Sequence, residues 1–395
     1  MTDCLQYLEK LVSFPTVSDT DPARDRPNLP LVEWAREEFA RLGFATEVID
    51  VAPGKACLLA HKGPLLGRKP GDRGGLLLSG HSDTVGCDPD LWASAPWRLE
   101  VREGRAFGLG ACDMKGFLAC ALAAAAKLAT SGRDAALSRG LGILITCDEE
   151  TSMAGAAAAA PRLKALGLAP ELVVIGEPTL MTPVFGHKGY MGRNLTVTGR
   201  ACHSSDPDRG VSAAHGAARA ILQLEALAKR LRDAPDARDP DFAPVDWATL
   251  NVGSVHGGDS VNRVCASARI EFDVRPTPRM NAAAVRPLLA ELEGALAREL
   301  QASGAAAALR DLYPDLEAFV NPDRAVRARV ESLAGRPGEF VAYATEASHL
   351  QALGPTVVMG PGSIAQAHGV DEFIELAELE RGEAMINRLI ESFAA

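Results

Sequence analysis

The sequence predicts an α/β protein in which a domain with a largely parallel central sheet is interrupted by a smaller α+β domain. Helical and strand-like segments alternate through residues 1–181, which is typical of a sheet with helices on both faces. Three short apolar runs, at 74–78, 141–146 and 172–175, are each followed by polar residues and are typical of buried strands. Beyond Glu177 the expected order becomes β-α-β-β-α-β, a split βαβ arrangement.

Each element of the first domain has its own signal. The N-terminal segment places Leu5, Leu8 and Leu11 on one face of a helix. A second helix ends at Gly43, a common helix stop, and Ala-rich stretches predict two more. These later helices are expected at 31–42, 115–129 and 155–166, and the strands at 46–51, 74–78, 141–146 and 172–175, with a loop rich in glycine, proline and basic residues at 63–75.

The second domain is expected as an insertion at 182–313, so that 1–181 and 314–395 together form the first domain. Its strand at 265–274 alternates clearly, with Ala268, Ile270 and Phe272 on one face. The other strands are expected at 193–199, 249–255 and 306–312, and the helices at 211–231 and 281–300, which is the order of a ferredoxin-like fold.

Composition and charge exclude several classes of function. The chain has 395 residues, of which 47% are hydrophobic and 23% charged, as in ordinary globular proteins. A formal net charge of −10, without a cluster of lysine or arginine, argues against nucleic acid and anionic membranes as partners. No segment has the pattern of a signal peptide or the length of a membrane span. The eight scattered cysteines are expected to be reduced thiols in a cytoplasmic protein.

Acidic residues and histidines follow the predicted strands at the points where these strands end. They are His81, Asp83, Asp113, Glu149, Glu150, Glu177 and, far down the chain, His368. Ligand groups gather at the carboxyl ends of parallel strands, so this set predicts a two-metal hydrolytic site. Taken singly, the His81-x-Asp83 pair is more often structural, and adjacent glutamates more often begin a solvated helix. Cys112 and Cys147 are alternative ligands, although burial is the favoured interpretation of both.

Several longer motifs resemble the M20 metallopeptidase family, which includes acetylornithine deacetylase, succinyl-diaminopimelate desuccinylase, aminoacylases and carboxypeptidase G2. The likeness covers essentially the whole chain, and it is most specific for the acetylornithine deacetylases. The motifs are Ala111-Cys-Asp-Met-Lys-Gly-Phe, Asp148-Glu-Glu-Thr-Ser-Met-Ala-Gly-Ala, Gly176-Glu-Pro-Thr, His187-Lys-Gly, His203-Ser-Ser-Asp-Pro, His256-Gly-Gly-Asp, Thr345-Glu-Ala and Gly360-Pro-Gly-Ser-Ile-Ala-Gln-Ala-His. The resemblance implies a Zn-peptidase-like catalytic domain and an inserted ferredoxin-like dimerisation domain.

The resemblance also implies roles for the metal-site residues. His81 and Glu177 would hold one metal, Glu150 and His368 the other, and Asp113 would bridge both. The implied cofactor is two Zn²⁺ per chain, with Co²⁺ or Mn²⁺ as substitutes. Asp83 would hydrogen-bond the other ring nitrogen of His81. Glu149 would act as the general base, and the interpretation of Glu149 as a further ligand is the weaker one.

The implied reaction is hydrolysis of N2-acetyl-L-ornithine to L-ornithine and acetate in arginine biosynthesis. The alternatives are deacetylation of N-acetylcitrulline or another N-acyl amino acid, and, more remotely, an inactive homologue that serves as a binding protein. His203 would stabilise the oxyanion in the partner subunit of a homodimer, Asn262 and Arg275 would bind the substrate carboxylate, and Glu346 would select the cationic tail. From the residues alone, His203 is also consistent with a structural histidine beside two serines, and Arg275 with a surface salt bridge. Cys202 and the Ser348-His349 pair depart from the family pattern close to these residues.

Overall fold

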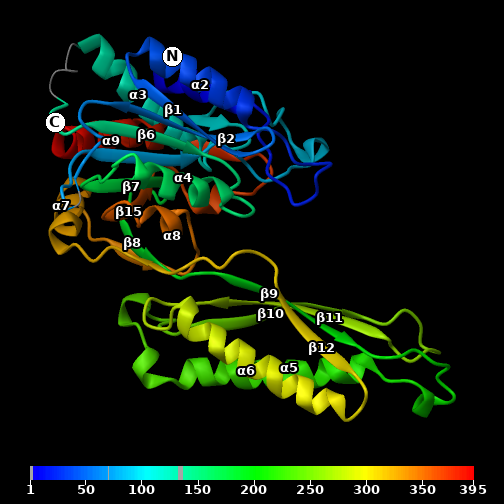
Figure 1. The fold of residues 1–395 in the computed structure, drawn as a ribbon. Helices are drawn as coiled ribbons and strands as arrows, with labels where there is room; N and C mark the ends of the chain where they lie inside the picture. The colour runs from blue at the N-terminus through cyan, green and yellow to red at the C-terminus, as the bar shows by residue number, and fades with distance from the viewer. Residues whose placement is uncertain (1–2, 70, 132–136) are drawn as a thin grey trace. The chain divides into compact units, whose positions relative to one another are not determined.

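The computed structural model describes residues 3–69, 71–131 and 137–395, which form two compact units (Figure 1). Unit 1 comprises Met1–Phe185, Asn321–Glu339 and Thr345–Ala395. Unit 2 comprises Gly186–Val320 and Phe340–Ala344. The insertion predicted at 182–313 thus begins and ends a few residues before the main segment of unit 2, and the short segment from Phe340 was not anticipated.

A mixed sheet with a parallel centre forms the middle of unit 1. Its order is β1-β2-β6-β3-β7-β15-β8-β13, and β14 also pairs with β8. The strands are β1 (Ala45–Ala52), β2 (Lys55–Lys62), β3 (Leu76–His81), β6 (Leu141–Thr146), β7 (Leu172–Pro178), β8 (Val184–His187), β13 (Phe319–Val320), β14 (Glu339–Val341) and β15 (Thr356–Gly360). The four strands β6, β3, β7 and β15 run parallel, whereas β1, β2 and β8 pair antiparallel. The predicted α/β class with a largely parallel central sheet is therefore confirmed.

Helices cover this sheet, and α3 is the most deeply buried of them. The helices of unit 1 are α1 (Asp3–Val12), α2 (Leu29–Arg41), α3 (Lys115–Ser131), α4 (Ala154–Ala165), α7 (Arg324–Ala334), α8 (Ala347–Leu350) and α9 (Leu376–Phe393). Helix α3 packs on β3 and β7 and also contacts α1 and α9. Its alanines allow this close packing because they are strong helix formers with little volume. Among the described residues, no helix is long and apolar enough to cross a membrane.

A short three-stranded ribbon borders the segments that carry two of the site residues. It has the order β16-β5-β4, with β4 (Glu100–Arg102), β5 (Arg105–Phe107) and β16 (Phe373–Glu375). Strand β16 pairs antiparallel with β5, with Phe373 opposite Phe107. The ribbon therefore joins the chain just before Asp113 to the chain just after His368.

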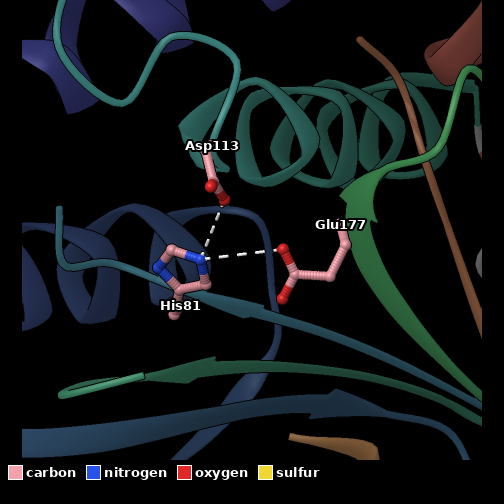
Figure 2. Close-up of side chains that lie close together, drawn as sticks. All are labelled: His81, Asp113 and Glu177. Atoms are coloured by element: carbon pink, nitrogen blue, oxygen red, sulfur yellow. Dashed lines mark hydrogen bonds and ion pairs between the residues drawn. The ribbon is translucent and has the colours of Figure 1, made fainter. Parts of the chain in front are cut away.

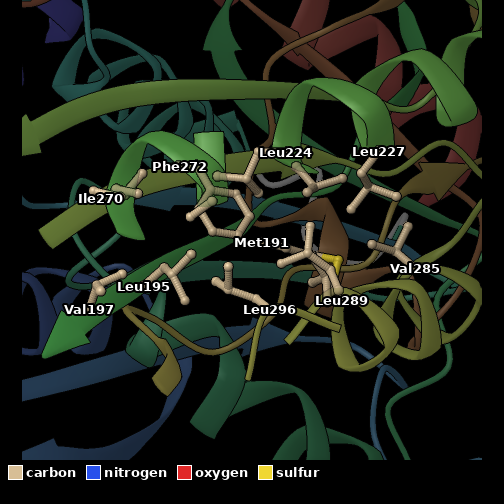
Figure 3. Close-up of a cluster of buried hydrophobic side chains, with 14 of the residues drawn as sticks. Met191, Leu195, Val197, Leu224, Leu227, Ile270, Phe272, Val285, Leu289 and Leu296 are labelled. Carbon is tan, nitrogen blue, oxygen red and sulfur yellow. The ribbon is translucent and has the colours of Figure 1, made fainter. Parts of the chain in front are cut away.

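Unit 2 has the predicted β-α-β-β-α-β order. Its elements are β9 (Met191–Thr198), α5 (Ala213–Asp233), β10 (Thr249–Gly257), β11 (Ser267–Arg275), α6 (Ala282–Gln301) and β12 (Ala306–Asp311). The antiparallel sheet has the order β10-β11-β9-β12. Leu224 and Leu227 of α5 and Leu289 and Leu296 of α6 pack on the sheet, where they meet Phe272 and its neighbours (Figure 3). The alternation along β11 is confirmed, since its inward residues are buried.

Helix caps in unit 2 follow from the sequence. The Ser212 hydroxyl accepts a hydrogen bond from the His215 N–H at the start of α5, and the Asn281 carbonyl accepts one from Ala284 at the start of α6. Such caps satisfy N–H groups that have no partner within the helix, which defines where each helix begins.

Candidate metal centre

The predicted metal-site residues of unit 1 meet at one edge of the parallel sheet. His81 is the last residue of β3 and lies in register with Thr146, the last residue of β6. Glu150 follows β6, and Glu177 lies near the end of β7. Because neighbouring parallel strands end on the same side, their terminal side chains converge at a single edge.

The first candidate group is buried and consists of His81, Asp113 and Glu177. The His81 Nε2 atom lies 3.2 Å from Asp113 Oδ1 and 3.9 Å from Glu177 Oε2 (Figure 2). His81 is only 1% exposed, and the two carboxylates are also buried. This group is therefore closed to bulk water on most sides.

The second candidate group lies nearer the surface and consists of Glu150, His368 and again Asp113. The His368 Nε2 atom lies 2.9 Å from Glu150 Oε2 and 3.6 Å from Asp113 Oδ2. The His368 side chain is 54% exposed. Its backbone φ of 60° lies in the left-handed region, which few non-glycine residues adopt.

Asp113 belongs to both groups and turns a different oxygen toward each histidine. Oδ1 faces His81, and Oδ2 faces His368. Within each group the potential ligand atoms all lie within 4.8 Å of one another. A carboxylate shared in this way can bridge two cations.

The site contains more carboxylates than groups that can carry a positive charge. Burial and the charge of Asp113 raise the pKa of Glu177 well above its usual value. Burial and the charge of Glu177 do the same to the pKa of Glu149. Burial lowers the pKa of His81, but the Asp113 hydrogen bond and the nearby carboxylates outweigh it and raise this pKa well above normal. Crowded buried carboxylates of this kind are stabilised by bound cations.

The donor atoms fit a divalent metal. Two imidazoles and three carboxylates form the groups, a mixture that suits zinc and related ions. The Glu177 Oε1 atom is buried without a hydrogen-bond partner, so it has a free lone pair in the site. A buried carboxylate oxygen is costly to leave in this state, and a metal would satisfy it. We conclude that the site is built to hold a metal cofactor.

Asp83 supports His81 differently from the prediction. The His81 Nδ1 atom lies 3.0 Å from the Asp83 backbone carbonyl oxygen and 3.7 Å from its carboxylate Oδ1. The carboxylate Oδ2 instead accepts a hydrogen bond of 3.2 Å from the Glu150 backbone N–H. The predicted hydrogen bond between the Asp83 carboxylate and the imidazole is therefore wrong. The backbone oxygen is the nearer acceptor, and the carboxylate holds the turn that carries Glu150.

The remaining candidates at these strand ends take other positions. Glu149 is partly buried beside the carboxylates and belongs to neither ligand group among the described residues. The Cys112 thiol donates to the Ser363 carbonyl at 3.4 Å, and burial raises its pKa, which disfavours the thiolate. Cys147 is buried as well, and neither thiol belongs to the two ligand groups.

Glu346 is fully buried close to the same strand end. Its Oε2 accepts a hydrogen bond of 2.8 Å from the Thr146 hydroxyl, and its Oε1 is buried without a partner. Burial raises its pKa to about 7, although the charge of His81 opposes this. The carboxylate is thus present at the centre with one free oxygen, and its predicted contact with the substrate tail stays a prediction.

Three predicted residues lie in unit 2. The exposed His203 accepts a hydrogen bond at Nδ1 from the Ser205 N–H at 3.1 Å, and its neighbour Ser204 donates to the Asn262 carbonyl at 3.0 Å. His203 and Asn262 are therefore brought together. Arg275 is the last residue of β11. It donates a hydrogen bond to Asp273 at 2.8 Å, and its guanidinium lies 4.5 Å from the centre of the Tyr190 ring.

Two supporting contacts were not anticipated from the sequence. The buried Glu372 carboxylate accepts hydrogen bonds from three backbone N–H groups of the segment that carries Asp113. The buried Lys55 ammonium lies 2.8 Å from Asp148, directly before Glu149, and 2.8 Å from Asp25. The position of Glu372 four residues after His368 was the only signal in the sequence.

The comparisons with known proteins agree with this geometry. Residues 77–392 match the model of peptidase family M20/M25/M40. This chain belongs to that family. It is 37% identical over 391 residues to acetylornithine deacetylase of Proteus mirabilis (strain HI4320), which covers 98% of this chain and 96% of the relative. It is 40% identical over 378 residues to acetylornithine deacetylase of Vibrio vulnificus (strain CMCP6), covering 94% and 93%.

The fold of the M20 family extends to distant structures. An M20 family metallo-carboxypeptidase from Sulfolobus solfataricus matches with a TM-score of 0.74 and 17% sequence identity, covering 99% of both chains. At this identity the likeness concerns the fold alone, and it confirms the predicted fold class.

Proposed function

We propose that this M20 family protein hydrolyses N2-acetyl-L-ornithine to L-ornithine and acetate, the step expected in arginine biosynthesis. The proposal depends on one observation: the two carboxylate oxygens of Asp113 face two separate histidine–carboxylate groups. Relatives named acetylornithine deacetylase, similar over nearly the whole chain, support the choice of substrate.

The proposed cofactor is two Zn²⁺, with Co²⁺ or Mn²⁺ as possible substitutes. His81 and Glu177 would hold one ion, Glu150 and His368 the other, and Asp113 would contribute an oxygen to each. When bound, such ions act as Lewis acids toward the amide carbonyl and lower the pKa of water. The protein supplies the ligands and, through buried β3 and β7, their fixed positions.

Glu149 is the proposed proton carrier. Its carboxylate lies among the site residues without belonging to a ligand group. It would accept the proton of the attacking water and deliver it to the leaving nitrogen, so that the C–N bond breaks to give a carboxylate and an amine. Burial and the charge of Glu177 raise the pKa of Glu149, and this favours the protonated form that delivers a proton to the leaving nitrogen.

Four residues are proposed to contact the substrate. Glu346 offers a buried carboxylate with a free oxygen, suited to an ammonium group. Arg275 and Asn262 are the candidates for the substrate carboxylate, and His203 for the developing oxyanion. We propose a homodimer formed through unit 2, in which His203 serves the site of the neighbouring chain. The eight free thiols support action in the cytoplasm.

In the main alternative, the same site hydrolyses an N-acyl amino acid with a different side chain. N-acetylcitrulline carries a neutral tail, and His349 beside Glu346 is partly buried with a pKa lowered by burial, so it is a candidate neutral partner. An inactive homologue that acts as a binding protein is a remote alternative, because all the expected ligands and Glu149 are present.

The deciding experiment measures amine release from acetylornithine, acetylcitrulline, acetylmethionine and succinyl-diaminopimelate. The metal-free protein should be inactive, and Zn²⁺ or Co²⁺ should restore turnover, fastest with acetylornithine. Preference for acetylcitrulline would replace the proposed substrate. An active protein that contains no transition metal by elemental analysis would overturn the proposed chemistry.

A further inference from the structure

One residue binds four backbone N–H groups of the segment that carries Asp113. The Glu372 carboxylate accepts hydrogen bonds from Gly110 at 2.9 Å, from Cys112 at 2.8 Å and from Asp113 at 3.0 Å. Its backbone carbonyl accepts a fourth, from Gly108, at 3.0 Å. Both carboxylate oxygens take part: Oε1 accepts from the Cys112 and Asp113 N–H groups, and Oε2 accepts from the Gly110 N–H group.

These bonds replace the ladder that a regular strand would provide. The segment between β5 and α3 is irregular, and Gly110 adopts a φ of 78°. Its N–H groups are buried and would be costly without acceptors. Glu372 is only 3% exposed, so its carboxyl oxygens are equally costly without donors. The Glu372 carboxyl group therefore supplies acceptors for these N–H groups, and the N–H groups supply donors for its buried oxygens.

Glu372 also connects the two segments that complete the second candidate group. It precedes β16, which pairs with β5, and it follows His368 by four residues. Its neighbour Asp371 adds a bond of 2.9 Å to the Ala93 N–H, which holds the same turn. A displacement of Glu372 would therefore disturb Asp113 and His368 together.

We propose that Glu372 is a positioning residue that orients Asp113 so that one carboxylate oxygen faces each metal position. The proposal rests on the proposed function, because the bridging role of Asp113 matters only for a two-metal site. Glu372 touches neither histidine by a hydrogen bond and belongs to neither ligand group. It acts through the backbone of Asp113 instead.

The test compares Glu372→Gln and Glu372→Ala with Glu375→Gln. Glu375 lies three residues further on, half exposed, and pairs with Arg105, so it is a matched control on the same ribbon. Co²⁺ affinity is measured by competition with a chelator, without substrate, and the visible spectrum of the Co²⁺-loaded protein reports the coordination of the ion. We expect Glu372→Ala to weaken Co²⁺ binding about 10–100-fold and to change the spectrum. Glu375→Gln should change neither.

The glutamine variant provides an intermediate result. The glutamine carbonyl oxygen can still accept hydrogen bonds from Cys112 and Asp113, whereas its NH₂ group cannot accept one from Gly110. The loss of Co²⁺ affinity should therefore be smaller in Glu372→Gln than in Glu372→Ala. With saturating metal, kcat should fall and KM should stay close to wild type. Wild-type Co²⁺ affinity and spectrum in folded Glu372→Ala would overturn the proposal. Unfolding of both metal-free variants would also overturn it, because Glu372 would then serve folding in general.

The proposed function fails separately. If wild-type protein binds Co²⁺ and Glu372→Ala weakens it, but no acetylornithine is hydrolysed, the positioning role stands and the assigned reaction does not. If wild-type protein hydrolyses acetylornithine and Glu372→Ala binds and turns over like wild type, only the positioning role fails.

Discussion

Single side chains at the centre differ in what they do because they differ in surroundings. Asp113 and Glu150 face histidines, whereas Glu149 lies in the same acidic region and is in neither ligand group. Adjacent residues in the sequence can thus take a ligand position and a proton-transfer position. Their separation is testable because each role has its own readout.

Substitution of Glu149 by glutamine should keep the metal and lose the reaction. The amide cannot accept a proton, so turnover should fall by roughly 10²–10⁴-fold, the usual contribution of general acid–base catalysis. Metal content is measured beside turnover. Glu150→Gln is the matched control, and it should lose metal from the His368 group. Near wild-type turnover in metal-loaded Glu149→Gln would assign the base elsewhere.

Glu346 should determine the preference for a cationic tail. Loss of one partner of a desolvated ion pair typically costs about 2–5 kcal/mol. Glu346→Gln should therefore reduce kcat/KM for acetylornithine far more than for acetylmethionine, whose tail is neutral. The glutamine can keep the hydrogen bond from Thr146, which makes it a mild change. Equal losses for both substrates would show that Glu346 supports the site without contacting the tail.

Glu346 should also make the metal-free protein less stable as pH rises. Its pKa is about 7 in the folded protein, raised by burial from an ordinary value of 4.5. Between these values the unfolded chain has lost a proton that the folded chain keeps, so the free energy of unfolding falls as pH increases. Urea unfolding should give a lower free energy of unfolding at about pH 8 than at about pH 5. Glu346→Gln should make this difference smaller by on the order of 1–3 kcal/mol. An unchanged pH dependence in the variant would contradict the assignment.

The turns after the strands depend on contacts between elements. Lys55 of β2 is 5% exposed and reaches Asp148 after β6 and Asp25 before α2. Asp148 has a φ of 58° and accepts several backbone N–H groups of the following turn at its carbonyl. Strand β2 therefore helps to place Glu149 and Glu150, although it carries no ligand.

Removal of the Lys55 charge should destabilise unit 1. Lys55→Met leaves Asp148 without its cation, and breaking a buried pair costs about 3 kcal/mol or more. Urea unfolding measures the loss, and the double variant with Asp148→Asn should recover part of it. The exposed Arg41–Glu38 pair is the control, where Arg41→Met should cost less than about 1 kcal/mol. If Lys55→Met lowered the free energy of unfolding by as little as Arg41→Met does, the Lys55–Asp148 pair would not be important for stability.

At the scale of the whole molecule, the proposed dimer would complete each site with His203 from the neighbouring chain. Chains with His203→Ala and chains with Glu149→Ala should each be inactive. A fully exchanged equal mixture should recover roughly a quarter of wild-type activity, because half of the dimers are mixed and each has one intact site. No recovery after confirmed exchange would place His203 in the site of its own chain or outside catalysis.

Much of the fold was predictable from the sequence because its signals are local. The apolar run at 141–146 became β6 without a change of bounds, and the alternation at 265–274 became β11. The helices around α3 and α5 followed their composition and spacing. Strands such as β13 and β16 went unnoticed, because two or three residues are too few to show a period.

The sequence by itself determined which residue types end the central strands, and so the acidic and histidine character of the site. Only the tertiary structure decided which atom meets which. The backbone oxygen of Asp83, not its carboxylate, reaches His81, and Glu372 holds a segment more than 250 residues away in the chain. The physical reason is that periodicity and composition report the burial of one segment. Hydrogen-bond partners depend instead on which groups of distant segments come within about 3 Å of each other once the layers have packed.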